Sequence, residues 1–112
     1  DRGESPLVTA KRELLEETGY SAKSWCKLGE LLPVPAYSDE KIFLFCAKDL
    51  IRECEQNTEP GECINLVDIT VEEFLVKVQN LEIIDAKTIA LAFWLLRIRD
   101  KTIKMKWETD NG

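Results

Sequence analysis

The chain has 112 residues, with 21 acidic and 15 basic side chains and a net charge of −6. This length suits one small domain rather than two, and the acidic balance disfavours a nucleic acid partner, because phosphate contacts need a basic surface. A small phosphorylated ligand is not excluded, since bound metal ions reverse the local charge. The sequence contains no recognisable signal peptide or membrane-spanning run, and we expect a protein without a membrane partner.

Cysteine usage indicates a reducing environment. The four cysteines, Cys26, Cys46, Cys54 and Cys63, form no C-x-x-C pair, and the chain has no histidine, so a zinc site of the usual kinds is not expected. Cys26 and Cys46 lie in apolar stretches and are predicted to be core residues. A Cys54–Cys63 bridge has little support, and we expect reduced thiols and a cytoplasmic location.

The first predicted element is a helix over about residues 5–18. Ser5 is a typical N-cap, and Pro6 suits the first helical position, where its missing N–H costs nothing. Gly19 can adopt the left-handed conformation that closes many helices. The apolar residues at i, i+3 and i+7, which predict a buried stripe, are Leu7, Ala10 and Leu14.

The same helix carries three carboxylates close together. Glu13, Glu16 and Glu17 stand at i, i+3 and i+4, which brings neighbouring side chains about 5–6 Å apart on one helical surface. Arg12 can pair with Glu16 at i+4, whereas no cation stands between Glu13 and Glu17. A hard divalent cation, above all Mg²⁺, would relieve their repulsion. A solvated acidic helix face explains the spacing equally well.

A strand is expected after this helix. Residues 21–24 are polar and are predicted to form a turn. Residues 25–32 are predicted to form a strand, in which Gly29 marks a bulge or a weak point.

A loop and a second strand follow. Pro33 and Pro35 interrupt regular structure, and residues 34–40 are predicted to form an irregular loop. Residues 41–47 are short, aromatic-rich and apolar on both faces. This composition predicts a central strand that is paired on both sides.

The next segment is acidic. Residues 49–62 contain the turn formers Asn57, Pro60 and Gly61 and are predicted to form a long mobile loop. Residues 64–69 are predicted to form another strand.

Two helices are expected in the C-terminal part. Thr70 and Glu73 form a capping box that begins the first helix. Asp85 caps the second, which is predicted over about residues 86–100 with a core-facing apolar stripe. The stripe residues are Ile89, Phe93 and Leu96. Residues 104–112 read as a polar tail, and the element order is compatible with an α/β/α sandwich.

The segment from Glu4 to Tyr20 resembles the signature of the Nudix hydrolases, G-x5-E-x7-R-E-U-x-E-E-x-G-U, in which U is bulky and apolar. Glu4 is followed after seven residues by Arg12-Glu13-Leu14-Leu15-Glu16-Glu17-Thr18-Gly19-Tyr20, which fills every later specified position. The opening Gly would precede Asp1. The resemblance therefore implies that residues 1–112 are the C-terminal portion of a single Nudix domain, with an α/β/α sandwich left incomplete because upstream strands are absent.

The loop after the first strand is similar to the ADP-ribose pyrophosphatase subfamily. Pro35 stands at a characteristic distance after the motif, and Ser38 and Glu40 form an S/T-x-E segment. The helix start at Asp85 also resembles that subfamily. The resemblance implies that Pro35, Ser38 and Glu40 contact substrate, although a single proline is also a simple loop breaker. Tyr37 suits either a ribose contact or an exposed loop position.

A second acidic cluster lies in the predicted loop over 49–62. Glu53 and Glu55 are interpreted as solvated surface residues. In the ADP-ribose subfamily, the loop before the corresponding strand supplies carboxylates to the metal centre. By that resemblance Glu62 maps onto a metal-ligand position and Glu59 onto the base that activates water, although Pro60-Gly61 alters the local spacing.

The resemblance implies metal-dependent hydrolysis of a pyrophosphate bond, with ADP-ribose yielding AMP and ribose 5-phosphate. The expected cofactor is Mg²⁺, with Mn²⁺ as an alternative, and the expected assembly is a homodimer. Glu16 is either a ligand or the partner of Arg12, and Glu4 is a weaker candidate for either role. The implied residues are Glu59, Arg12 and Glu16 for catalysis; Glu13, Glu17 and Glu62 for metal; and Pro35, Ser38 and Glu40 for substrate.

Three other interpretations remain open. The substrate could be another nucleotide sugar or a dinucleotide. The chain could be a catalytically silent Nudix-fold module that binds a nucleotide, although the intact residues Arg12, Glu13, Glu16 and Glu17 disfavour this. An acidic interaction domain agrees with the charge but gives no reason for the full motif.

Overall fold

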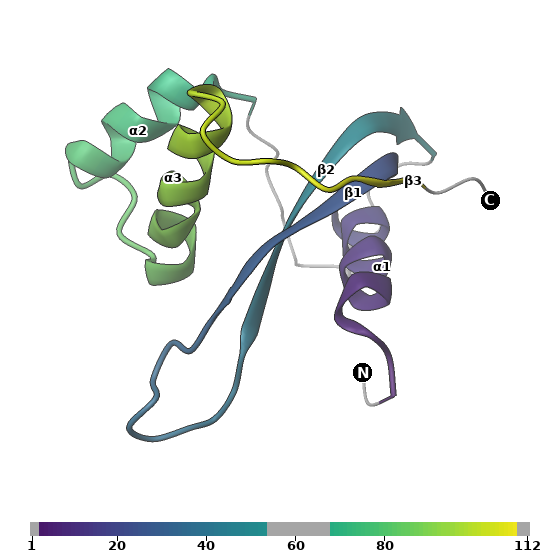
Figure 1. Ribbon diagram of the computed structural model, residues 1–112, viewed down its shortest axis with the longest axis horizontal. Coiled ribbons are helices and arrows are strands. Elements are labelled where there is room, and N and C mark those ends of the chain that lie inside the picture. The colour runs from purple at the N-terminus through teal and green to yellow at the C-terminus, as the bar shows by residue number, and fades with distance from the viewer. Residues whose placement is uncertain (1–2, 54–67, 110–112) are drawn as a thin grey trace, which may run out of the picture. The chain divides into compact units, whose positions relative to one another are not determined.

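The computed structural model describes residues 3–53 and 68–109 (Figure 1). In chain order, the elements are α1 (Pro6–Thr18), β1 (Tyr20–Leu31), β2 (Ile42–Arg52), α2 (Val71–Gln79), α3 (Ala86–Arg99) and β3 (Glu108–Thr109). The internal contacts divide the chain into two compact units. The first contains α1, the first part of β1, most of β2 and β3, and the second contains the rest of the hairpin with α2 and α3. This mixture of helices and strands is the predicted α/β class.

The strands form a three-stranded sheet in the order β2–β1–β3. β3 pairs antiparallel with β1, so that Ser24 lies opposite Thr109 and Trp25 opposite Glu108. The predicted strand over 41–47 is confirmed within β2. Its predicted central position is wrong for the described sheet, in which β1 lies in the middle and β2 at an edge. The apolar composition of a strand indicates that its two faces are buried. It does not indicate whether the strand has a hydrogen-bonded neighbour on each side.

β1 begins earlier than the sequence indicated. The turn predicted over 21–24 is wrong, because the strand starts at Tyr20. Ala22 and Ser24 are buried, whereas Lys23 between them is exposed. The polar residues of this stretch therefore belong to the strand, which continues into a run of three buried residues, Ser24, Trp25 and Cys26.

β2 continues into the stretch predicted to be loop. Residues 49–52 are the last four residues of this strand, so the predicted loop boundary at 49 is wrong. The remainder of the predicted acidic loop from residue 54, and residues 64–67 of the next predicted strand, lie outside the described residues. Residues 68–70 lead into α2 without strand structure. β3 forms inside the segment predicted to be a polar tail.

The core of the first unit lies on the sheet. Trp25 is buried and meets the ring of Phe45 edge to face, with centroids 6.3 Å apart. Cys26 is buried and Cys46 is half-buried, and both are free thiols, as predicted. Burial raises the pKa of the Cys46 thiol, and the neighbouring Cys26 acts in the same direction. Cys54 and Cys63 lie outside the described residues.

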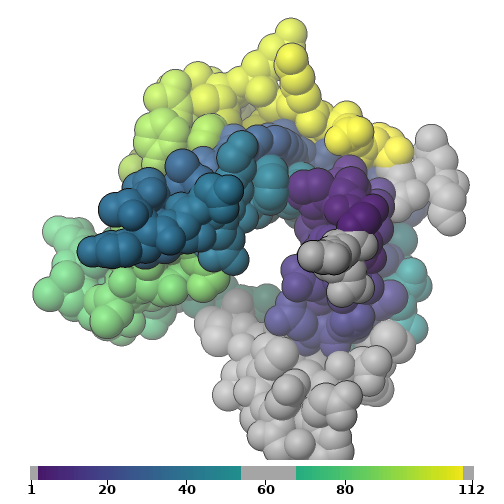
Figure 2. Space-filling model, turned by 90° about the horizontal axis from the view of Figure 1, so that it is seen from below, coloured from purple at the N-terminus to yellow at the C-terminus, as the bar shows by residue number. Residues whose placement is uncertain are grey.

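α2 and α3 pack against each other in the second unit (Figures 1 and 2). The predicted capping box of α2 is confirmed: Glu73 N donates to Thr70 Oγ1, and Thr70 N donates to Glu73 Oε1, both at 3.0 Å. Asp85 caps α3 by accepting from Thr88 N at 3.0 Å. Within the described residues, no helix is both long enough and apolar enough to cross a bilayer.

The predicted core-facing stripe of α3 is not buried in the described structure. Ile89, Phe93 and Leu96 are 38%, 53% and 37% exposed. The less exposed apolar residues of α3, which include Leu91, Trp94 and Ile98, lie on the opposite side of the helix, so the predicted choice of core-facing stripe is wrong. Trp94, which stands next to Phe93 on the helix, is half-buried and contacts Gly29 of β1.

Candidate active site

α1 has the ends that its sequence predicts. Ser5 Oγ accepts a hydrogen bond from Val8 N at 3.2 Å, and Pro6 occupies the first helical position. Gly19 closes the helix in the left-handed conformation, with φ of 80°, and its N–H donates to Leu15 O at 2.9 Å. Ser5 and Gly19 therefore define the helix that carries the acidic residues.

The exposure of α1 differs from the prediction. No residue of this helix is buried in the structure, and the predicted stripe of Leu7, Ala10 and Leu14 is half-buried. Glu13 and Glu17 are exposed. These carboxylates are therefore accessible to a ligand from solution.

Arg12 links two carboxylates on either side of it in the sequence. Its Nη2 donates to Glu4 Oε1 at 3.0 Å, and its Nε donates to Glu4 Oε2 at 3.3 Å. Its Nη1 lies 3.3 Å from both carboxylate oxygens of Glu16. Thr9 Oγ1 adds a bond of 2.9 Å to Glu4 Oε1. The structure thus places both Glu4 and Glu16, two residues with open roles, at the guanidinium of Arg12.

These contacts shift the acid–base properties of the pair. The hydrogen bond from Arg12, followed by that from Thr9, lowers the pKa of Glu4 from 4.5 to about 2. The bonds to Glu4 and Glu16 raise the already high pKa of Arg12. Glu4 is therefore an anion and Arg12 a cation across the whole physiological range.

Glu13 and Glu17 lie on a different side of the helix from Arg12 and Glu16. At 3.6 residues per turn, the two i, i+4 pairs are separated by about 100° around the helix axis. Arg12 is engaged by Glu4 and Glu16. The exposed pair Glu13 and Glu17 is the one that the sequence assigned to metal.

The predicted metal ligands are only partly within the described residues. Glu59 and Glu62 lie outside them, so their predicted roles stay predictions. Among residues 3–53 and 68–109, no three histidine, cysteine or acidic side chains come together as a metal-binding group. The described part of the predicted set is therefore the helical pair Glu13 and Glu17.

Glu53 has an environment that the sequence does not reveal. It is exposed, as its interpretation as a solvated surface residue expects, and in addition its N–H donates to Gly19 O at 2.9 Å. Its Oε2 accepts from Ser21 Oγ at 2.9 Å. These bonds join the residue that follows β2 to the C-cap of α1 and to β1. The pairing of distant residues that creates them leaves no local signal in the sequence. Glu55 lies outside the described residues.

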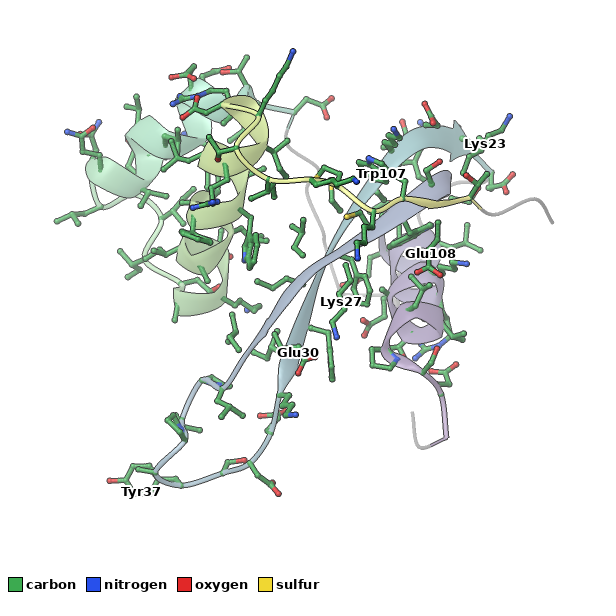
Figure 3. The ribbon with its side chains drawn as sticks, in the orientation of Figure 1. Lys23, Lys27, Glu30, Tyr37, Trp107 and Glu108 are labelled. Carbon is green, nitrogen blue, oxygen red and sulfur yellow. The ribbon has the colours of Figure 1, made fainter. Side chains whose placement is uncertain are left out.

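The predicted substrate residues occupy the loop between β1 and β2. Ser38 Oγ accepts a hydrogen bond from Glu40 N at 3.0 Å, so the loop orients this hydroxyl. Pro35 lies in the turn that closes with Ser38 N donating to Val34 O at 2.9 Å. Tyr37 is 91% exposed at the tip of the loop (Figure 3). These residues belong to the second unit, whereas α1 belongs to the first.

Comparison with known proteins assigns the family. The family model described as the NUDIX domain matches residues 1–92. The chain belongs to the NUDIX family. The match covers α1, both long strands and the beginning of α3, and the Nudix resemblance of Glu4 to Tyr20 is confirmed.

Several relatives resemble this NUDIX chain over most of its length. It is 36% identical over 101 residues to an ADP-ribose pyrophosphatase of Bacillus subtilis (strain 168), which covers 89% of this chain and 54% of the relative. It is 35% identical over 96 residues to a methanol dehydrogenase activator of Bacillus methanolicus, covering 85% of this chain and 52% of the relative. It is 36% identical over 90 residues to a GDP-mannose pyrophosphatase of Cronobacter sakazakii, covering 79% of this chain and 47% of the relative. The chain thus spans about half the length of these relatives.

Proposed function

We propose that this NUDIX chain carries the metal-binding helix of a hydrolase that cleaves the pyrophosphate bond of a nucleoside diphosphate linked to another group. ADP-ribose is the proposed substrate, with AMP and ribose 5-phosphate as products. The observation that carries the proposal is the arrangement on α1, where Arg12 is engaged by Glu4 and Glu16 while Glu13 and Glu17 are exposed. The names of the relatives from Bacillus subtilis and Cronobacter sakazakii support the reaction class.

The residues of α1 fit a hard divalent cation. Glu13 and Glu17 present carboxylate oxygens from adjacent turns, and Mg²⁺ or Mn²⁺ prefers such ligands. A rigid helix holds them better than a loop would. We propose Glu62 as the ligand that completes this set. When bound, the cation would lower the pKa of a coordinated water and offset the charge that develops on phosphorus oxygens.

The remaining proposed roles belong to residues of the chain. A water oxygen attacks phosphorus, the bridging P–O bond breaks, and Glu59 takes the proton of the water. Arg12 holds the carboxylate of Glu16 in position through the contacts described above. In this proposal, Pro35, Ser38 and Glu40 contact the substrate.

The wider setting is part of the same proposal. We place residues 1–112 in one NUDIX domain, in a cytoplasmic protein that forms a homodimer and uses Mg²⁺ in preference to Mn²⁺. Reduced Cys26 and Cys46 agree with a reducing compartment. The net charge of −6 argues against nucleic acid as a partner.

A second candidate is hydrolysis of a nucleotide sugar. The relative named GDP-mannose pyrophosphatase is 36% identical, the same figure as for the relative from Bacillus subtilis. Both substrates contain a pyrophosphate that joins a nucleoside to a sugar. The helix chemistry suits either one, so the choice depends on contacts to the base and the sugar.

The experiment measures product release by this chain. ADP-ribose or GDP-mannose is incubated with the chain and Mg²⁺, with and without excess EDTA, and nucleoside monophosphate is quantified by chromatography. We expect AMP release that EDTA abolishes and that Glu17→Gln lowers by about 100-fold or more. Faster release of GMP from GDP-mannose would favour the second candidate.

A matched variant controls for loss of one negative charge. Glu82→Gln removes a carboxylate that pairs with Lys77 at 3.5 Å in the second unit, and it should retain full activity. Circular dichroism of each variant checks the fold. A folded Glu17→Gln protein with unchanged turnover would contradict the metal assignment. Mn²⁺ binding without turnover of either substrate would favour a silent nucleotide-binding module.

A further inference from the structure

The carboxylate of Glu4 is held by more than its ion pair with Arg12. Glu4 precedes the N-cap Ser5, so it lies outside the helix. Its Oε1 nevertheless accepts two hydrogen bonds, from Arg12 Nη2 at 3.0 Å and from Thr9 Oγ1 at 2.9 Å. The second of these donors is not a specified position of the Nudix motif, so its contact is visible only in the folded chain.

We propose that Thr9 is a positioning residue, whose hydroxyl holds Glu4 so that Arg12 stays fixed against Glu16. The chain of contacts runs from Thr9 Oγ1 to Glu4, from Glu4 to Nε and Nη2 of Arg12, and from Nη1 of Arg12 to Glu16. The effect of Thr9 on turnover rests on the proposed function. Its effect on Arg12 does not.

The orientation of the Thr9 hydroxyl supports this role. A threonine inside a helix often returns its hydroxyl to the carbonyl four residues earlier. Here the backbone N–H of Thr9 donates to Ser5 O at 3.0 Å, and the hydroxyl donates to the Glu4 side chain instead. The hydroxyl is therefore used for a contact between side chains.

Thr9 can hold Glu4 in place because it is a more rigid side chain than Glu4 and Arg12. Glutamate and arginine have long side chains that lose much rotamer freedom when they are fixed. Threonine is branched at Cβ and has few accessible rotamers in a helix, so it is a nearly rigid donor. The hydrogen bond from Thr9 also lowers the pKa of Glu4, after the larger effect of Arg12. Thr9 thus restricts a carboxylate that would otherwise sample several positions.

The consequence for the site is a fixed distribution of charge on α1. Arg12 is held between Glu4 and Glu16, so the positive charge of its guanidinium stays on one side of the helix. The carboxylates of Glu13 and Glu17 lie on a different side. A site that stabilises developing charge works best when its charges are fixed before the reaction. Loosening Glu4 would let the guanidinium move and would lower turnover more than substrate binding.

The test compares Thr9→Val with Thr9→Ser. Valine keeps the branched shape and removes the donor, whereas serine keeps the donor. The matched control is Thr102→Val, which removes a threonine hydroxyl bonded to Arg97 O at 3.3 Å in the second unit. The readouts are the Nε–H NMR signal of Arg12 and the values of kcat and KM for AMP release.

We expect Thr9→Val to move the Arg12 Nε–H signal toward that of a free arginine and to lower kcat by about tenfold with little change in KM. Thr9→Ser and Thr102→Val should behave like the original chain. An unchanged Arg12 signal in Thr9→Val would overturn the proposal, and so would equal losses in the valine and serine variants. If the original chain releases no AMP, the proposed function fails in this assay, and the Arg12 signal alone decides the role of Thr9.

Discussion

The indole ring of Trp94 lies against the backbone of Gly29. A Cβ atom built on Gly29 would stand 2.6 Å from Cζ2 of Trp94, well inside a normal contact distance. Both residues belong to the second unit, where α3 supplies the ring and β1 supplies the glycine. The sequence predicts a bulge or a weak point of the strand at Gly29. In the structure, its missing side chain allows this close approach.

Gly29→Ala is therefore expected to destabilise the chain. The new methyl group collides with ring carbons of Trp94, and overpacking of this kind costs about 1–3 kcal/mol. Urea denaturation followed by circular dichroism measures the change in the free energy of unfolding. As a control, Gly29→Ala is combined with Trp94→Leu, and the double variant should lose less than the sum of the two single losses. Strictly additive losses would contradict the clash.

Arg12→Gln is expected to raise the pKa of Glu4 from about 2 toward its ordinary value of 4.5. The hydrogen bond from Arg12 is the largest cause of the lowered pKa, and the variant weakens it. Because the pKa is lower in the folded state, this contact contributes stability that is fully present above pH 4.5 and is lost as pH falls toward 2. Carboxyl-detected NMR follows the titration of Glu4 directly.

Glu73 provides the internal control for that titration. Its pKa is also lowered, but the causes are the backbone and side-chain hydrogen bonds of Thr70 in the capping box of α2. Arg12→Gln should therefore leave the titration of Glu73 unchanged. A Glu4 midpoint near 4.5 in the original chain would contradict the ion pair with Arg12.

The features that the sequence predicted well are those decided by near neighbours. Ser5, Gly19, Thr70 and Asp85 act as caps because their groups bond to backbone atoms within four residues. The i, i+4 contact between Arg12 and Glu16 follows from helix geometry in the same way. The helix ends, and within the candidate site the contact of Arg12 with Glu16, therefore follow from the amino-acid sequence alone.

The features that the sequence predicted badly depend on distant partners. The pairing of Trp25 with Glu108 makes β1 the middle strand, and no local pattern in β2 could indicate it. The contacts of Glu53 with Gly19 and Ser21, which were not predicted from the sequence, likewise join residues far apart in the chain. The stripe that includes Phe93 is apolar as predicted, but its exposure is decided by what packs against it.

Thr70→Ala is expected to destabilise α2. The threonine hydroxyl accepts from Glu73 N at 3.0 Å, and loss of such an N-cap costs about 1 kcal/mol. Thermal unfolding measures the change in the free energy of unfolding. Thr102→Ala is the matched control, because the exposed hydroxyl of Thr102 donates to Arg97 O in the last turn of α3 and does not cap the start of a helix. Equal losses of unfolding free energy in the two variants would show that the N-cap of α2 does not stabilise the chain more than an ordinary threonine hydrogen bond.

Glu13→Gln and Glu17→Gln are expected to be coupled in Mn²⁺ binding. If both carboxylates hold the same ion, the loss in affinity from the double variant should fall short of the product of the single losses by about tenfold. Electron paramagnetic resonance of free Mn²⁺ measures each affinity without requiring turnover. Glu82→Gln, whose carboxylate pairs with Lys77, should bind Mn²⁺ like the original chain. If the fold loss in Mn²⁺ affinity of the double variant equals the product of the two single losses, Glu13 and Glu17 act on separate ions. This outcome would replace the shared site with two sites on one helix.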